Sequence, residues 1–380
     1  MTTSALKQAR LARGWSQSRL VAGMESYARR HTIQIAATAS LHVYVSEWEN
    51  GRRRISSPYA GILRGILGLT EDELPPPGDE PSSGNSWPDG YKDLAKRVRS
   101  YRAVSGSVVG NFMAQTELLR SLDRQLGAAQ LVDQMQSHLA TIQDALTFSV
   151  LPASRRPLAL ALGSASTLAA WQALDVGAVD RAWRHYEVAK SAARDAEAPA
   201  HLAYAMGEQA YVLAEAGELG LAVELVREAA YVGAGVASGK LMAWVASAEA
   251  ELCARAGIRD DCLRALERAD CLLPPGDDAR DEDVPSIFLN ASHLARWRGN
   301  ALALIGDEHA VAGLYSALGG LDPSFTRAEA GLRCDLAQAH MARGEYDEAA
   351  AHLSVARLVT SRTGSVRHRR RIDRLTGASS

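Results

Sequence analysis

The feature that most constrains this chain is a glycine that recurs about every forty residues in its second half. The spacings between successive copies are 40, 40, 49 and 38 residues, and the copies are Gly177, Gly217, Gly257, Gly306 and Gly344. Each follows one apolar helical pattern and precedes another. Small residues recur at fixed offsets of −7, +5 and +12 from these glycines: Ala170, Ala210, Ala250, Gly299 and Ala337; Ala182, Ala222, Cys262, Val311 and Ala349; Ala189, Ala229, Ala269, Leu318 and Ala356. Small residues in register allow two antiparallel helices to pack closely, and stacked hairpins bury a core that one hairpin could not. We therefore expect an array of helical hairpins over residues 156–376.

Two segments of this region resemble tetratricopeptide (TPR) repeats, namely EAGELGLAVELVREA at 215–229 and ARGEYDEAAAHLSVA at 342–356. The period exceeds the usual ~34 residues, so we expect extended helices. The polar insert PPGDDARDEDVP within the 49-residue interval predicts a loop between hairpins. The basic end RHRRRIDRL is typical of a capping helix, with a nucleic-acid role as the alternative.

Composition favours an all-α protein, because Ala and Leu dominate, only four Phe occur, and Gly and Pro fall between apolar runs. No apolar run approaches the ~20 residues that cross a bilayer, and the N-terminus lacks a signal-peptide core. We therefore expect a cytoplasmic protein that acts on the nucleoid. The four cysteines (Cys253, Cys262, Cys271 and Cys334) form no CxxC pair and are interpreted as small buried residues.

The N-terminal part differs in charge from the rest. Residues 1–70 hold ten Lys/Arg and three Asp/Glu, or 10 − 3 = +7, while the whole chain carries −2. Such a local excess indicates a module that binds a polyanion. The segment PPPGDEPSSGNSWPDG predicts a linker at 75–90, followed by a helical connector at 91–155 with a break at Gly127.

Within residues 1–74, LKQARLARGWSQSRLV reads as a helix, a Gly stop and a new helix capped by Ser16. VSEWENGRRRISSPY reads as a short helix ending at Asn50-Gly51, then a helix capped by Ser57, with a last short helix from Thr70. This pattern resembles the XRE family, the Cro-and-repressor type of helix-turn-helix, over about residues 4–74. The whole layout resembles actinobacterial XRE regulators with a C-terminal TPR-like domain. The resemblance implies a five-helix domain whose third helix lies in the major groove.

The resemblance also implies the contacts with double-stranded DNA. Residues 41–49 become the recognition helix, capped by Ser40, and its chemistry suits base edges: histidine for guanine, valine for the thymine methyl, glutamate for cytosine. The expected DNA-binding residues are Gln17, Leu41, His42, Val43, Tyr44, Ser46, Glu47, Asn50, Arg52, Arg53 and Arg54. A merely solvated role stays open for Glu47.

Other residues of this part are expected to be structural. We interpret Val45 and Trp48 as core residues, and Arg10 and Glu49 as a structural ion pair. About fourteen residues more than in compact family members separate helices two and three. We expect MESYARRHT to lengthen helix two and IQIAATAS to form a loop.

In stacked hairpins the first helix of each pair lines the concave side, which here carries two rows of aromatic and polar residues. Thirteen residues before the glycines stand Ser164, Tyr204, Trp244, His293 and Gly331, and six before stand Trp171, Tyr211, Glu251, Asn300 and Gln338. Aromatic walls with a few polar groups suit a peptide or small effector. The expected effector residues are Trp171, Tyr204, Tyr211, Trp244, Glu251, His293 and Asn300. Dimerisation, or packing on the N-terminal domain, is the alternative use of this face.

These observations predict a transcriptional regulator that binds a palindromic operator as a homodimer. The rival interpretation is a TPR interaction scaffold whose helix-turn-helix domain has no specific operator. The sequence contains no Gly-rich phosphate loop, HExxH, CxxC or GxSxG motif, so neither enzymatic activity, a cofactor nor a metal is expected.

Overall fold

The computed structural model describes most of the chain. The described residues are 5–31, 33, 35–50, 55–70, 74, 90–102, 106–276, 280–281, 283–322 and 325–377. Within them the secondary structure is helical, apart from one isolated β-bridge between Arg280 and Phe288. None of these helices is both long and apolar enough to span a membrane. The chain divides into two compact units, Met1–Gly90 and Tyr91–Ser380, at the end of the Pro- and Gly-rich segment.

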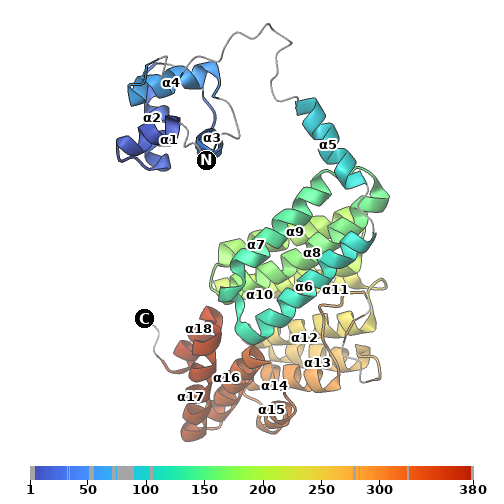
Figure 1. Cartoon of the computed structure of the whole chain (residues 1–380). Helices are drawn as coiled ribbons and strands as arrows, with labels where there is room; N and C mark the ends of the chain where they lie inside the picture. Colours follow the sequence, from blue (N-terminus) through green and yellow to red (C-terminus); the bar gives the residue numbers. More distant parts are fainter. Residues whose placement is uncertain are drawn as a thin grey trace. The chain divides into compact units, whose positions relative to one another are not determined.

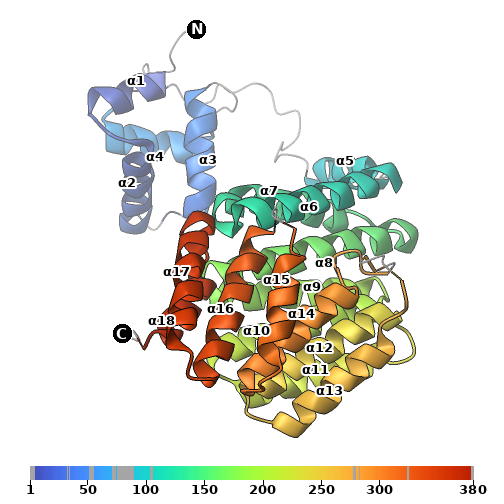
Figure 2. The same ribbon diagram turned by 90° about the horizontal axis from the view of Figure 1, so that it is seen from below.

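The N-terminal unit contains four described helices, labelled in Figures 1 and 2. They are α1 (Ala5–Ala12), α2 (Gln17–Arg30), α3 (Thr38–Glu49) and α4 (Ser57–Leu67). The Ser16 hydroxyl accepts a hydrogen bond from the Arg19 amide at 3.1 Å and so caps α2, as the sequence predicts. The fifth helix expected after Thr70 falls mainly outside the described residues.

Two helix starts differ from the sequence prediction. α3 begins at Thr38 rather than Leu41, so Ser40 lies inside the helix and is not its cap; Ala37 takes the cap position without a side-chain hydrogen bond. The Thr38 hydroxyl instead donates to the Glu25 carboxylate at 2.5 Å, which ties the first turn of α3 to α2. In α4, the cap is Ser56 and Ser57 is already helical.

The insert between α2 and α3 is folded onto the rest of the unit. Helix α2 extends to Arg30, as expected for MESYARRHT. In the following stretch, Ile33 and Ile35 pack against the core of the unit. The Ala36 amide donates to the Tyr59 hydroxyl oxygen of α4 at 3.0 Å. These contacts hold the start of α3 against α4 despite the longer connection.

The C-terminal unit begins with three helices and continues as five hairpins and a last helix (Figure 1). The first three are α5 (Gly90–Arg102), α6 (Gly106–Leu126) and α7 (Val132–Thr147), with a 3₁₀ turn, Ala128–Gln130, before α7. The hairpins are α8 (Pro152–Asp175) with α9 (Val179–Asp195), α10 (Pro199–Ala216) with α11 (Leu219–Gly233), α12 (Gly239–Arg255) with α13 (Arg259–Leu272), α14 (Ala291–Leu304) with α15 (Ala310–Gly319), and α16 (Thr326–Ala342) with α17 (Tyr346–Thr363). Helix α18 (Val366–Leu375) follows as the expected capping helix.

The recurring glycines lie between the two helices of every hairpin. All five adopt positive φ, between 69° for Gly306 and 92° for Gly217. Only glycine takes this conformation without strain, which explains why the first helix of each pair ends there. The small residues at the fixed offsets face the partner helix: Ala170, Ala210, Ala250 and Ala337 are fully buried. The predicted array of helical hairpins is therefore confirmed.

The array closes on itself, which the sequence does not reveal. Arg327 of α16 pairs with Asp123 of α6 and lies 3.4 Å from Asp175 of α8. Asp175 also accepts a hydrogen bond from Ser365, just before α18, at 2.6 Å. Gly127 packs so tightly on the Thr363 backbone that a Cβ there would lie 2.1 Å from the carbonyl oxygen. The last helices of this unit thus contact its first ones.

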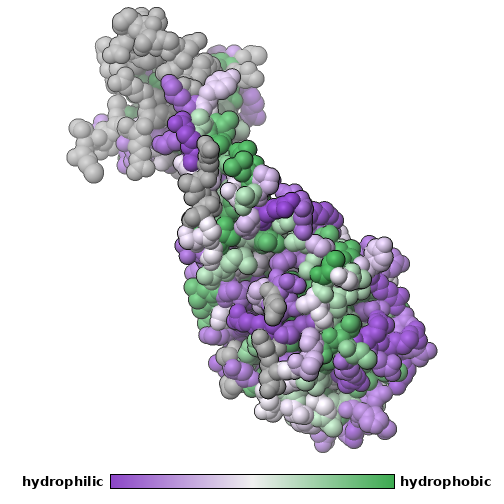
Figure 3. All heavy atoms as spheres, turned by 90° about the vertical axis from the view of Figure 1, so that its right-hand side faces the viewer, coloured by the Kyte–Doolittle hydropathy of each residue, from purple (hydrophilic) through white to green (hydrophobic). Residues whose placement is uncertain are grey.

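On the face shown in Figure 3, hydrophilic and apolar side chains are interspersed.

Candidate functional site

One face of helix α3 is buried in the core of the N-terminal unit, and this determines which residues lie on its outward face. Leu41, Val45 and Trp48 are 0, 0 and 4% exposed, as spacings of four and three residues on one helical face require. Val45 and Trp48 were expected there. Leu41 was expected to contact DNA, and this is corrected: it shares the face of Val45, so its side chain packs inward.

The opposite face of α3 carries His42, Val43, Ser46 and Glu47. Val43 is 54% exposed, while the other three are half-buried. Tyr44 packs beside them, with its ring centroid 5.8 Å from that of Trp48 and 6.1 Å from that of Tyr59.

After α3, Asn50 is exposed, and its side-chain amide donates to the Ser46 carbonyl oxygen at 2.8 Å. The expected contacts from Arg52, Arg53 and Arg54 lie outside the described residues.

A buried polar network fixes the C-terminal end of α3. Arg10 of α1 donates through Nε and Nη2 to the two carboxylate oxygens of Glu49, at 2.5 and 2.9 Å. Gln17 donates its side-chain amide to the same carboxylate at 2.9 Å. Burial alone would raise the pKa of Glu49, but these hydrogen bonds hold that pKa below its ordinary value. The expected Arg10–Glu49 pair is thus present, and Gln17 joins it at the start of α2.

In the repeat unit, members of the same row on the first helices contact one another between successive hairpins. Tyr204 contacts Trp244 with ring centroids 5.2 Å apart, and Trp171 contacts Tyr211 at 6.2 Å. Trp297 joins both pairs, at 6.3 Å from Trp244 and 6.4 Å from Tyr211. Sequence reasoning missed Trp297, although it lies one helical turn after the row residue at position 293 and so shares its face.

Most of these aromatic rings belong to the core and are not open walls. Tyr204, Tyr211 and Trp244 are only 6, 2 and 7% exposed. The two tyrosine hydroxyls are also engaged, since Tyr204 donates to Glu208 at 3.1 Å and Tyr211 to Glu251 at 3.1 Å. The expectation of an open aromatic groove is corrected on this point.

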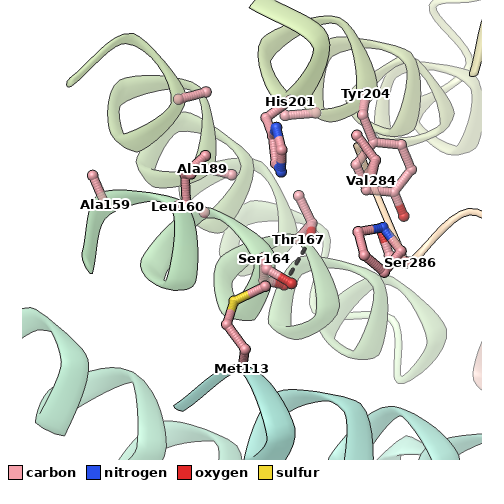
Figure 4. Close-up of a pocket in the computed structure, with 14 residues that line it drawn as sticks. Met113, Ala159, Leu160, Ser164, Thr167, Ala189, His201, Tyr204, Val284 and Ser286 are labelled. Carbon is pink, nitrogen blue, oxygen red and sulfur yellow. Dashed lines mark hydrogen bonds between the residues drawn. The ribbon is translucent and has the colours of Figure 1, made fainter. Parts of the chain in front are cut away.

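A small pocket lies where the rows meet the loop before α14 (Figure 4). Met113 of α6, Thr167 of α8 and Tyr204 of α10 surround it together with Ser286 of the loop. The Thr167 hydroxyl donates to the Ser164 carbonyl oxygen at 2.8 Å. The volume of this pocket is about 20 Å³, which suffices for roughly one water molecule. The pocket is therefore too small for an effector.

A much larger cavity, here named the α18 cavity, lies between α18 and the first helices of several hairpins. It encloses about 350 Å³. Three members of the row six residues before the glycines line it, namely Glu251, Asn300 and Gln338. His293 is absent from this lining and packs edge-on against Phe288, with centroids 4.7 Å apart. Burial, with the nearby positive charge of an arginine, lowers the pKa of His293 to about 4.

Arginines dominate the wall of the α18 cavity. Arg255, Arg367 and Arg374 approach the single carboxylate of Glu215 at 3.3, 3.5 and 3.8 Å. Burial would raise the pKa of Glu215, but the three guanidinium groups hold it below its ordinary value. Arg367 also lies over the Trp171 ring, 4.8 Å from its centroid. Sequence reasoning missed this cluster, because its members come from α10, α12 and α18.

The described residues include further histidines, cysteines and carboxylates outside these sites. Among them, no group of three or more His, Cys, Asp or Glu could hold a metal ion. Cys253, Cys262 and Cys334 are buried as expected, and burial raises the pKa of each thiol to about 11. Cys271 is exposed, which corrects the expectation for that residue.

Comparison with known proteins finds alignments only among solved structures. No protein-family model matches the sequence, and no curated protein matches it. Among solved structures, a Rap protein complexed with competence and sporulation factor aligns over 92% of this chain and 96% of its own, at 12% identity and a TM-score of 0.47.

Two further structures align less well. The Rap conjugation gene regulator of plasmid pLS20, in complex with the Phr* peptide, covers 91% of this chain and 97% of its own, at 10% identity and TM-score 0.40. The Q17M structure of TPR-like repeats of a Podosopora anserina kinesin light chain covers 52% of this chain and 94% of its own. The sequence identity is 16% and the TM-score is 0.35. At these identities and TM-scores, the alignments carry no conclusion about this chain.

Proposed function

We propose that this protein is a transcriptional regulator whose N-terminal unit is an XRE-type helix-turn-helix domain that reads double-stranded DNA with α3. The supporting observation is the division of α3 into two faces. One face is buried in the core and its end is held by the Arg10–Glu49 pair. The other presents His42, Val43 and Glu47, which can donate to guanine, contact a thymine methyl and accept from cytosine, respectively.

The charge of this part of the chain supports the same proposal. Residues 1–70 carry a formal excess of +7, as counted above. Lysines and arginines supply most of the affinity for DNA by neutralising phosphates, whereas the base-edge contacts supply discrimination. A carboxylate on the recognition face is compatible with this division, because it selects cytosine while the surrounding charge provides attraction.

The repeat unit is proposed to be the regulatory part. Its first helices hold the α18 cavity, which is large enough for a small effector. We further propose that the protein acts as a homodimer on a palindromic operator, since symmetric regulators place two recognition helices about one DNA turn apart.

The test begins with selection of bound fragments from genomic DNA by the full chain, followed by fluorescence anisotropy on the enriched sequence. Val43→Ser removes the apolar group from α3, and Leu11→Ser is the matched control, because Leu11 of α1 is 55% exposed against 54% for Val43. We expect Val43→Ser to lose about tenfold in affinity, in keeping with the ~1–3 kcal/mol of a base-specific contact. Leu11→Ser is expected to bind like the unmodified protein. Enrichment of no sequence would instead favour the TPR interaction scaffold.

A further inference from the structure

The α18 cavity holds more positive charge than its carboxylates neutralise. Its lining contains four arginines, Arg255, Arg367, Arg371 and Arg374, and two glutamates, Glu215 and Glu251. The charge of one of these arginines is neutralised by a residue outside the lining, because Arg371 pairs with Asp335 at 2.6 Å. His368 adds no charge, since its burial beside arginines keeps its pKa well below the ordinary value. The remaining excess of positive charge comes from the three arginines that surround Glu215.

The three arginines around Glu215 have more donors than its carboxylate can accept from. A guanidinium offers five N–H donors, while one carboxylate has about four lone-pair positions for all three groups. Their distances of 3.3, 3.5 and 3.8 Å exceed the ~2.7–2.9 Å of a good charge-assisted hydrogen bond. Arg255 makes one further bond, from Nη2 to the Ala214 carbonyl oxygen at 3.1 Å. Several donors therefore have no acceptor at bonding distance among the described residues.

One further arginine, Arg296 of α14, lies outside the lining of the cavity. Arg296 makes no hydrogen bond and no ion pair within the described part of the chain, yet it is close enough to Glu251 and Asp335 to feel their charges. The loss of hydration there lowers the pKa of Arg296. The lining itself holds four arginines against Glu215, Glu251 and the Asp335 carboxylate that pairs with Arg371, an excess of 4 − 3 = +1.

The wall of the cavity also contains an amide and apolar side chains. Asn300 donates to Asp335 at 2.6 Å, and its side-chain oxygen is buried without a partner among the described residues. Leu304 and Leu375 contribute apolar surface. A cavity of about 350 Å³ with these groups lies within the ~300–1,000 Å³ range of small-molecule sites.

We propose that the α18 cavity binds a small organic anion carrying carboxylate or phosphate groups, with Arg255, Arg367 and Arg374 as its cationic contacts. These guanidinium groups match both kinds of anion in geometry. Because Arg255 belongs to α12 and the other two to α18, the anion bridges the last helix to the middle of the array. The role of the anion as effector rests on the proposed function, whereas its binding does not.

The test uses the full chain at low ionic strength, with citrate, inorganic phosphate and pyrophosphate as probes and sodium chloride of equal ionic strength as the blank. Isothermal titration calorimetry and thermal unfolding measure binding, since a ligand of the folded state raises Tm. We expect at least one probe to bind and to raise Tm. Stronger binding of citrate would identify a carboxylate ligand, and stronger binding of either phosphate probe a phosphorylated one.

Two variants locate the site. Arg374→Gln is chosen because this side chain is 57% exposed, so the fold tolerates its loss. Arg184→Gln is the matched control on α9, where a 77% exposed arginine has Asp180 as its one ion-pair partner in the described part of the chain. We expect Arg374→Gln to weaken binding about tenfold, as the loss of one hydrogen bond between charged groups implies, and Arg184→Gln to leave it unchanged. Equal affinity in the two variants would overturn the proposed site.

Absence of binding by every probe at about 10 mM, where a millimolar site would be filled, would also overturn it. DNA affinity is then measured with and without the bound probe. A protein that binds the anion but no DNA refutes the proposed function and leaves the anion site standing. A protein that binds DNA but no anion refutes the anion site and leaves the proposed function standing.

Discussion

Replacing Arg10 by methionine tests how α3 is held, because it removes one partner of a buried ion pair and leaves the other charged. The Arg10 and Glu49 side chains are 8 and 1% exposed, and they share two hydrogen bonds of 2.5 and 2.9 Å. Loss of one partner of such a pair costs about 3–5 kcal/mol. A small domain is stable by only about 5 kcal/mol, so we expect Arg10→Met to unfold much of the N-terminal unit.

Hydrogen exchange read by mass spectrometry measures this unit separately from the repeats, because each peptide reports its own opening free energy. We expect the protection of α2 and α3 to fall by the stated amount, with the repeat peptides unchanged and DNA binding lost. Arg13→Met is the control, since Arg13 is exposed and, within the described residues, donates a single hydrogen bond, to the Ile66 carbonyl oxygen at 2.9 Å. Equal protection in the two variants would refute the reasoning. The double variant Arg10→Met/Glu49→Leu is expected to regain part of the stability, because no charge then stays buried.

Three further predictions concern pH, packing and thiol access. The pKa of Glu49 is lowered on folding, so its stabilising contribution is present above the ordinary carboxyl pKa of about 4.3 and is lost as the pH falls toward the folded value; acid titration by hydrogen exchange should therefore open α3 before the repeats. Gly127→Ala should cost at least about 2 kcal/mol more in urea unfolding than Gly344→Ala: both glycines have positive φ, but only at Gly127 does the added Cβ meet backbone, the Thr363 carbonyl oxygen. Equal costs would show that this contact is absent in solution. Native protein should react with one equivalent of a thiol reagent, at Cys271, and with four after unfolding; a second fast thiol would contradict the burial of the others.

The hairpins could be predicted from sequence because each is a local structure. The glycine, the small residue before it and the two residues at the fixed offsets after it all lie within about twenty residues, so the pattern encodes both helices and their packing. The same holds for Trp48 and Val45 on α3. By contrast, the start of α3 depends on the contact of Thr38 with Glu25 of another helix, which no local pattern contains.

The α18 cavity illustrates what sequence periodicity omits. The row residues Glu251, Asn300 and Gln338 were placed on one side by their common offset, and the structure brings them to one cavity. The arginines opposite them could not be assigned there, because Arg367 and Glu215 are about 150 residues apart and meet only through the path of the whole array. The basic composition of the last helix was visible, but not the direction in which its charges point.

Contact between the first and last helices of the repeat unit also bears on how this unit unfolds and how it can evolve. An open repeat protein frays from its ends, where a terminal repeat has one neighbour, and tolerates the gain or loss of repeats. Here Arg327 joins α16 to α6 and α8, so the terminal hairpins have neighbours on both sides. The unit should therefore lose its structure in one cooperative step. Insertion or deletion of a whole hairpin would leave the two ends out of register, so the number of repeats is fixed by geometry.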